Sequence, residues 1–169
     1  MKDIIIFIIS LGILVIFSVI DVISHRKFKK IPNLIFHIIG ISAVLISLGF
    51  LFVSEFKFTL LIYLGIVLIL CSFIIIILTY IQIKNHFLTA KGIVKTGLYK
   101  YARHPMYSGI ILFFIGLIVA VPSFYVFVYS IIAILLIIYQ AYEEEKFLEK
   151  KFQEYKKYKK ETGMIMPKF

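Results

Sequence analysis

Charged residues are scarce in this chain of 169 residues. Asp, Glu, Lys and Arg together supply 17% of the sequence, whereas apolar residues supply 62%. An ordinary globular protein has about 45–50% apolar residues, and a chain of this length has too little interior to bury such an excess. The composition therefore excludes a soluble enzyme and a disordered chain, and it predicts a membrane protein.

Cysteine and clustered metal ligands are also rare. The single cysteine, Cys71, lies inside an apolar run, so an intramolecular disulfide is excluded. The four histidines lie far apart and no cysteine pair accompanies them, so we expect no metal site. A glycine-rich loop between a strand and a helix is missing as well, which excludes a Rossmann-type cofactor site.

Long uncharged runs are what the sequence does contain. Three of them, at residues 4–20, 32–53 and 59–81, are close to the ~20 residues that cross the hydrocarbon core of a bilayer. A fourth run, at 106–142, is too long for one crossing, and Pro122 near its middle interrupts a helix. We therefore expect a helical hairpin with arms at 106–120 and 124–142. The predicted fold is all-α, with five transmembrane helices and an amphipathic cytosolic tail helix at 147–158.

The net charge of +10 is unevenly distributed along the chain. Segments 24–30, 84–105 and 140–169 hold 17 of the 19 Lys and Arg residues, and a five-helix path places all three on one side. The positive-inside rule then predicts an N-terminus outside and a C-terminus in the cytosol. We expect the protein to lie in the cell membrane. Nothing resembles a nucleic-acid-binding module, so no nucleic-acid partner is expected.

Polar residues gather where residues 97–109 lead into the fourth helix. Pro105 occupies the first turn, where proline is favoured, and Tyr107 lies three residues beyond His104, near the same side of the helix. Arg103 and free backbone N–H groups lie at the same helix N-terminus as these side chains. This helix N-terminus therefore suits a carboxylate or phosphate. Anchoring at the membrane interface explains the same residues equally well.

Two glycines of the fourth helix, Gly109 and Gly116, lie seven residues apart and therefore share one helix face. Small residues at this spacing permit close contact with another helix. We therefore expect this face to pack against a neighbouring helix.

Three adjacent carboxylates, Glu143, Glu144 and Glu145, follow the fifth apolar run. They gain nothing from the helix dipole at that end. They form either a solvated helix extension or an acceptor for a cation or for ribose hydroxyls. Because a tight hairpin brings its outer ends together, we expect this acidic end to face Arg103 and His104. Such a pocket suits a zwitterionic ligand with a positive centre.

These motifs resemble those of the isoprenylcysteine carboxyl methyltransferase family and of related membrane phospholipid methyltransferases. The shared pattern is Gly-x-Tyr, Arg-His-Pro-x-Tyr, a helical hairpin, Glu-Glu-x-x-Leu-x-x-x-Phe, Tyr-x-x-Tyr and a final Pro. The matching residues, within 90–169, are Gly97, Tyr99, Arg103, His104, Pro105, Tyr107, Glu144, Glu145, Leu148, Phe152, Tyr155, Tyr158 and Pro167. The sequence departs from the family in two places. Phe152 and Tyr155 are one residue closer together than in the family, with no glycine between them. Met164 stands where Arg is common.

The resemblance implies an integral membrane methyltransferase that moves a methyl group from S-adenosylmethionine to a lipidic acceptor entering from the bilayer. The first three helices, residues 1–83, would then lie on the lipid-substrate side, and residues 84–169 would bind the cofactor. The implied catalytic residues are Arg103 and Glu144. The implied cofactor contacts are Gly97, Tyr99, His104, Pro105, Tyr107, Glu144, Glu145 and Tyr158.

The expected acceptor is the carboxylate of an isoprenylcysteine-like, prenylated substrate. A carboxylate is already ionised at neutral pH and needs no base, whereas an amine arrives protonated and needs one. A phospholipid amine N-methyltransferase is the alternative within the class. A non-catalytic membrane protein that retains the fold is the alternative outside it, and the two departures from the family pattern motivate it.

Overall fold

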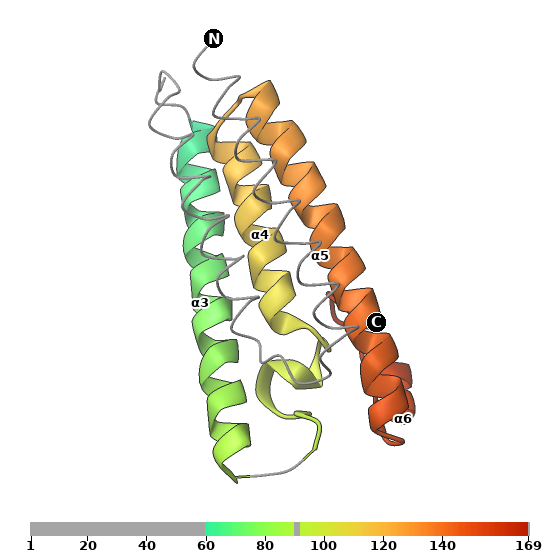
Figure 1. Ribbon diagram of the computed structural model, residues 1–169. Helices are drawn as coiled ribbons and strands as arrows, with labels where there is room; N and C mark the ends of the chain where they lie inside the picture. The colour runs from blue at the N-terminus through green and yellow to red at the C-terminus, as the bar shows by residue number, and fades with distance from the viewer. Residues whose placement is uncertain (1–59, 90–91, 169) are drawn as a thin grey trace.

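The computed structural model describes residues 60–89 and 92–168, so the expected helices at 4–20 and 32–53 lie outside the described residues. Every regular element in the described ranges is a helix, which confirms the all-α class there. Figure 1 shows the three long helices α3, α4 and α5 side by side, with α6 beside the lower end of α5. The elements are α3 (Leu60–Thr89), the 3-10 helix η1 (Gly97–Lys100), α4 (Pro105–Ala120), α5 (Phe124–Lys151) and α6 (Tyr155–Glu161).

Two of the described helices are long and apolar enough to cross a membrane, Leu60–Lys84 within α3 and Phe124–Lys151. Helix α4 has 16 residues. At about 1.5 Å per residue it is roughly 24 Å long, which is less than the ~30 Å hydrocarbon core. By length and composition, two of the described helices can therefore span a bilayer, and the count of five transmembrane helices stays a prediction.

Helix α5 extends well beyond its apolar part. It has 28 residues, and seven of the nine residues at 143–151 are charged. A bilayer core of ~30 Å takes about 20 helical residues, so a membrane-spanning part of α5 that begins at Phe124 would end near Tyr142, before the charged residues. The acidic triplet is thus part of a rigid helix rather than of a loose tail.

The expected single tail helix at 147–158 is wrong. Helix α5 ends at Lys151, and Phe152 has an extended backbone with φ −127° and ψ 113°. The chain then turns, and α6 begins at Tyr155. This break reverses the chain, so that Phe152, Tyr155 and Tyr158 lie against the lower end of the helical bundle, where a continuous helix would have carried them away from it.

The glycine face of α4 packs against α3, as the spacing of the two glycines predicts. A Cβ atom on Gly116 would lie 2.9 Å from the carbonyl oxygen of Gly65 and 3.1 Å from the backbone nitrogen of Ile69. A Cβ atom on Gly109 would lie 3.2 Å from the carbonyl oxygen of Ser72. Only hydrogen fits at these contacts, so the two backbones approach closely.

The expected hairpin joins α4 to α5 through residues 121–123. The N–H of Val121 still donates to the carbonyl of Leu117 at 2.9 Å, and the N–H of Ser123 donates to that of Val121 at 2.7 Å. The hairpin buries an apolar core whose members are Phe113, Phe114, Leu117, Ala120, Val121, Val126, Tyr129 and Ala133. This packing holds α4 and α5 antiparallel, so the start of α4 meets the charged end of α5 (Figure 1).

Candidate functional site

A buried ion pair joins the start of α4 to the end of α5. The Nε atom of Arg103 lies 2.6 Å from Oε1 of Glu145, and the two side chains are 6% and 2% exposed. The Nζ atom of Lys159, on α6, lies 2.9 Å from the other carboxylate oxygen of Glu145. The prediction that the acidic end of the fifth helix faces Arg103 and His104 is therefore confirmed.

The remaining donors of Arg103 hold the end of α6. Its Nη1 atom donates to the carbonyl oxygen of Lys159 at 3.0 Å and also to the carbonyl oxygen of Thr162. A planar guanidinium presents donors in several fixed directions, so one side chain can link three segments. Arg103 thus connects α4, α5 and α6 through bonds within the protein.

Residues 162–165, which we call the C-terminal strap, lie across the start of α4. The backbone N–H groups of Arg103 and His104 donate to the carbonyls of Gly163 at 2.9 Å and Met164 at 3.0 Å. The Ser108 hydroxyl donates to the carbonyl of Ile165 at 2.5 Å. The strap therefore occupies these two backbone donors, which precede the first residue of α4. Met164 makes this contact through its backbone, so the absence of arginine there does not affect it.

His104 lies between two carboxylates. Its Nδ1 atom is 3.7 Å from Glu144 and its Nε2 atom is 3.6 Å from Glu145. The imidazole is 6% exposed and stacks on the Tyr107 ring with centroids 5.3 Å apart. Its Nε2 atom has no hydrogen-bond partner among the described residues. A buried ring nitrogen of this kind can form a hydrogen bond with a ligand.

The three adjacent glutamates have different environments. Glu143 pairs with Lys146 at 2.7 Å, and Glu145 is buried in the ion pair with Arg103. The Glu144 side chain is 29% exposed and accepts a hydrogen bond from the Tyr107 hydroxyl at 3.0 Å. Glu144 also lines a cavity, whereas Glu143 and Glu145 are not among the lining residues in the described part of the chain.

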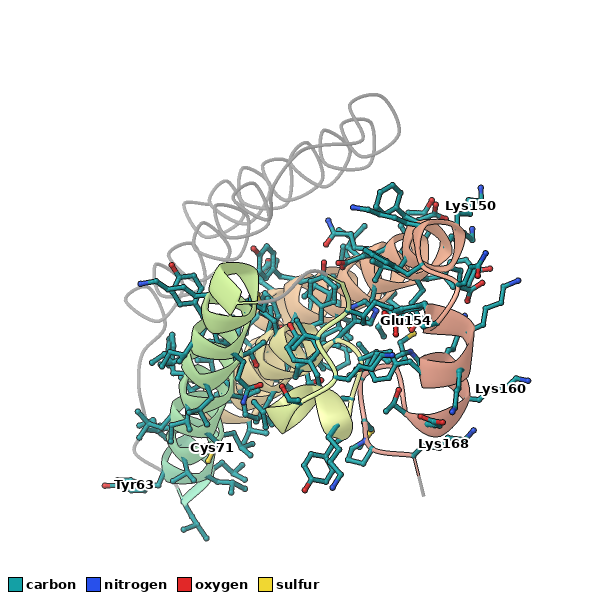
Figure 2. The ribbon with its side chains drawn as sticks, turned by 90° about the horizontal axis from the view of Figure 1, so that it is seen from below. Tyr63, Cys71, Lys150, Glu154, Lys160 and Lys168 are labelled. Atoms are coloured by element: carbon teal, nitrogen blue, oxygen red, sulfur yellow. The ribbon has the colours of Figure 1, made fainter. Side chains whose placement is uncertain are left out.

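The cavity lies between the C-terminal end of α3, the start of α4, the end of α5 and the start of α6. Its volume is about 180 Å³, roughly ten times what one ordered water needs, so a ligand group fits inside. Figure 2 views this end of the bundle from below and shows the labelled Lys150, Lys160 and Lys168 at its outer edge. The lining residues are Ile83, Gly92, Ile93, Val94, Tyr99, Arg103, His104, Met106, Tyr107, Glu144, Leu148, Phe152, Tyr155 and Tyr158.

Five residues proposed from the sequence meet at this cavity besides Glu144, namely Tyr99, Arg103, His104, Tyr107 and Tyr158. The Tyr158 hydroxyl donates to the carbonyl of Tyr99 at 2.5 Å, so it fixes the loop that covers the site.

Three other proposed residues, Gly97, Pro105 and Glu145, are not among the lining residues in the described part of the chain. Gly97 has φ +60°, and the Gln82 amide occupies the space that a Cβ would need. The Gln82 Oε1 atom accepts the N–H of Leu98 at 3.1 Å, which ties this turn to α3. Pro105 is the first residue of α4. These residues support the loop and the helix start that form the cavity, without lining it themselves.

Burial and charge set the protonation states at the site. Burial raises the pKa of the Glu145 carboxyl, but the neighbouring His104, Arg103 and Lys159 outweigh it and lower the pKa to about 2. Burial raises the pKa of Tyr158 to about 12, and it raises the pKa of Tyr155 as well. At neutral pH Glu145 is therefore a carboxylate and both phenols are neutral.

Several residues of the site were not assigned a role from the sequence. Tyr155, Leu148 and Phe152 belong to the quoted motifs, so the pattern signalled them without indicating a function. Lys159 looked like one of many surface lysines. The apolar lining from α3 and the following loop, such as Ile83 and Val94, carried no signal, because these residue types are common throughout a membrane protein.

Comparison with protein families matches residues 56–155 to the phospholipid methyltransferase family. No curated protein and no solved structure matches the chain. The matched segment covers more than half of the 169 residues. It contains all of α3, α4 and α5 and every residue of the cavity lining except Tyr158. The chain therefore belongs to the phospholipid methyltransferase family.

Proposed function

We propose that the protein moves a methyl group from S-adenosylmethionine to the headgroup of a lipidic acceptor at the cytosolic face of the membrane. The family supplies the reaction class, that of a membrane methyltransferase. The observation that carries the proposal is that Glu144 and His104 line one cavity at the end of two apolar helices, and that the buried Nε2 atom of His104 has no hydrogen-bond partner among the described residues. A lipid headgroup and a polar methyl donor would meet at such a place.

The residues around the cavity fit the methyl donor. When bound, its sulfonium supplies an electrophilic methyl group, and its amino-acid end is a zwitterion. Glu144 would accept hydrogen bonds from the amino group or the ribose, and His104 and Tyr107 would lie beside that end. Tyr99 and Tyr158 would cover it, and the apolar Leu148 and Phe152 side chains would exclude water. Exclusion of water and correct orientation are what in-line methyl transfer needs most.

Arg103 has a different role in this proposal from the one expected from sequence. Its guanidinium binds Glu145 and two carbonyls of the C-terminal segment. We therefore assign it as a positioning residue that holds the end of α5 so that Glu144 points into the cavity. Glu144 remains the residue proposed to touch the ligand. Gly97, Pro105 and Glu145 support the loop, the helix start and the ion pair.

Two acceptors remain in this proposal. The carboxylate of an isoprenylcysteine-like substrate follows from the ordered motifs and needs no base. A phospholipid amine is favoured by one observation, the placement of the His104 ring 3.6 to 3.7 Å from two carboxylates. An amine acceptor needs a base to remove its proton before transfer, and His104 and Glu144 are the candidates that line the cavity. The chemistry of the product distinguishes the two acceptors.

Binding of S-adenosylhomocysteine to the detergent-solubilised full chain, measured by calorimetry, tests the proposal. We expect the wild type to bind, and His104→Ala and Glu144→Ala to weaken binding at least tenfold. Glu143→Ala is the matched control, because that carboxylate pairs with Lys146 and does not line the cavity. A folded wild type that binds no S-adenosylhomocysteine would support the non-catalytic alternative.

Transfer of a radiolabelled methyl group into a total lipid extract then identifies the acceptor. Base treatment releases volatile methanol from a methyl ester, whereas a methylated amine keeps its label. Volatile label would support the isoprenylcysteine-like carboxylate. Retained label in the lipid phase would support the phospholipid amine.

A further inference from the structure

The Tyr155 hydroxyl is a buried polar group that the fold itself does not use. Tyr155 is the first residue of α6 and is 1% exposed. It lines the cavity, and its hydroxyl has no hydrogen-bond partner among residues 60–89 and 92–168. A buried hydroxyl without a partner is destabilising, and phenylalanine would fill the same space without that penalty. We therefore expect the hydroxyl to form its hydrogen bond with a bound ligand.

Tyr158, one turn later on the same helix, provides an internal comparison. The two rings pack edge to face with centroids 5.8 Å apart, and both line the cavity. The Tyr158 hydroxyl donates to the carbonyl of Tyr99 at 2.5 Å, so its role is to hold the loop. The hydroxyl of Tyr155 is left available, although it lies in the same layer of the structure.

A second residue of the cavity lining, on another element, also has a buried polar atom without a hydrogen bond. The Nε2 atom of His104, at the start of α4, is buried and also lacks a hydrogen-bond partner among the described residues. The nearby cations Arg103 and Lys159 are engaged with Glu145. Glu144 supplies negative charge on another wall. A ligand that carries both a positive centre and an oxygen acceptor would satisfy the carboxylate and the hydroxyl together.

We propose that Tyr155 is a ligand-binding residue whose hydroxyl donates a hydrogen bond to an anionic oxygen of the molecule that occupies the cavity. Two sources of this oxygen share the required chemistry, namely the carboxylate of the methyl donor and an anionic oxygen of the lipid acceptor. The inference rests on the proposed function, and it adds to that function a residue that neither the sequence nor the family match assigns.

The test uses the detergent-solubilised full chain with Tyr155→Phe, which removes only the hydroxyl. Tyr101→Phe is the matched control, because Tyr101 is 57% exposed and does not line the cavity. Calorimetric titrations use S-adenosylhomocysteine and methylthioadenosine, which lacks the amino-acid carboxylate. If the donor supplies the oxygen, Tyr155→Phe weakens S-adenosylhomocysteine binding roughly tenfold or more, as for a hydrogen bond to a charged group. Methylthioadenosine binding then stays the same.

If the lipid supplies the oxygen, Tyr155→Phe leaves S-adenosylhomocysteine binding unchanged and raises the KM for the total lipid extract by a similar factor. Unchanged values in both assays overturn the inference. The thermal midpoint without ligand should stay the same or rise, because an unpaired buried hydroxyl is removed. A marked fall in that midpoint would assign the hydroxyl a structural role and would also overturn the inference.

The two proposals fail in distinguishable ways. A wild-type chain that neither binds S-adenosylhomocysteine nor transfers methyl groups overturns the proposed function and this inference together. A wild-type chain that does both, accompanied by a Tyr155→Phe variant that matches it in every assay, overturns the inference alone.

Discussion

The Nε atom of Arg103 lies 2.6 Å from the Oε1 atom of Glu145, with both side chains almost fully buried. The two residues are 42 positions apart in sequence, and the α4–α5 hairpin brings them together. Because Glu145 is held by this pair, the rotation of α5 about its own axis is fixed at that point. Glu144, the preceding residue, is then directed into the cavity. The ion pair thus helps to decide which of three neighbouring carboxylates lines the cavity.

Breaking this ion pair should strongly destabilise the protein. Arg103→Met leaves Glu145 buried without its main partner, and loss of one member of a buried pair typically costs about 3–5 kcal/mol. We expect the free energy of unfolding in detergent to fall by that amount. Lys95→Met is the control, because the Lys95–Glu154 pair has side chains 40% and 54% exposed and should contribute at most about 1 kcal/mol. Equal effects from the two variants would contradict the structural role of Arg103.

Acid should remove the contribution of Glu145 to stability. The pKa of this carboxyl is lowered from 4.5 to about 2 in the folded protein, so its contribution is present above pH 4.5 and is lost as the pH falls toward 2. The full shift corresponds to about 3 kcal/mol. Thermal unfolding between pH 6 and pH 2.5 should show a steeper acid loss for the wild type than for Glu145→Gln. Parallel pH profiles for the two proteins would refute this explanation.

Neutralising the cavity carboxylate should affect function more than stability. Glu144→Gln keeps the size of the side chain but removes the negative charge that the ligand is proposed to meet. We expect kcat/KM for methyl transfer to fall at least tenfold, while the thermal midpoint changes by a few degrees at most. Glu143→Gln, at the surface pair with Lys146, should retain activity. If Glu143→Gln were the impaired variant, the rotation of α5 described above would be wrong.

A methyl group at Gly116 should force α3 and α4 apart. Its Cβ would meet the carbonyl oxygen of Gly65 at 2.9 Å and the backbone nitrogen of Ile69 at 3.1 Å, and backbone atoms cannot move aside as side chains do. We expect Gly116→Ala to cost about 1–3 kcal/mol, as is typical of overpacking. Ile115→Leu, at a neighbouring position that is 41% exposed, should be close to neutral. A Gly116→Ala variant as stable as the wild type would contradict the close helix contact.

The distribution of basic residues predicts that the C-terminus and the site lie in the cytosol. A green fluorescent protein fused after residue 169 should therefore fluoresce, whereas alkaline phosphatase fused at the same place should be inactive in a bacterial host. The positive-inside rule supplies the physical reason. Active phosphatase at this position would reverse the predicted topology and place the cavity on the outer side.

Much of the architecture followed from the sequence, because a bilayer permits few kinds of spanning structure. Uncharged runs of about 20 residues predict spanning helices, and Pro122 marked the turn between α4 and α5. The spacing of Gly109 and Gly116 indicated a close helix contact, and the structure supplies α3 as its partner. The opposition of Arg103 and the glutamates was also predictable, since a tight hairpin leaves few other arrangements.

The tertiary structure decided the details on which the chemistry depends. Three consecutive glutamates are equivalent in sequence, and only the rotation of α5 separates Glu144 from its neighbours. The break after Lys151 and the use of the Arg103 and His104 backbone donors by the C-terminal strap arise from contacts between residues about 60 positions apart. Local pattern carries no information about such contacts. The low content of charged residues indicated by itself that the protein belongs in a membrane, whereas long-range packing determined which of those few charges line the cavity.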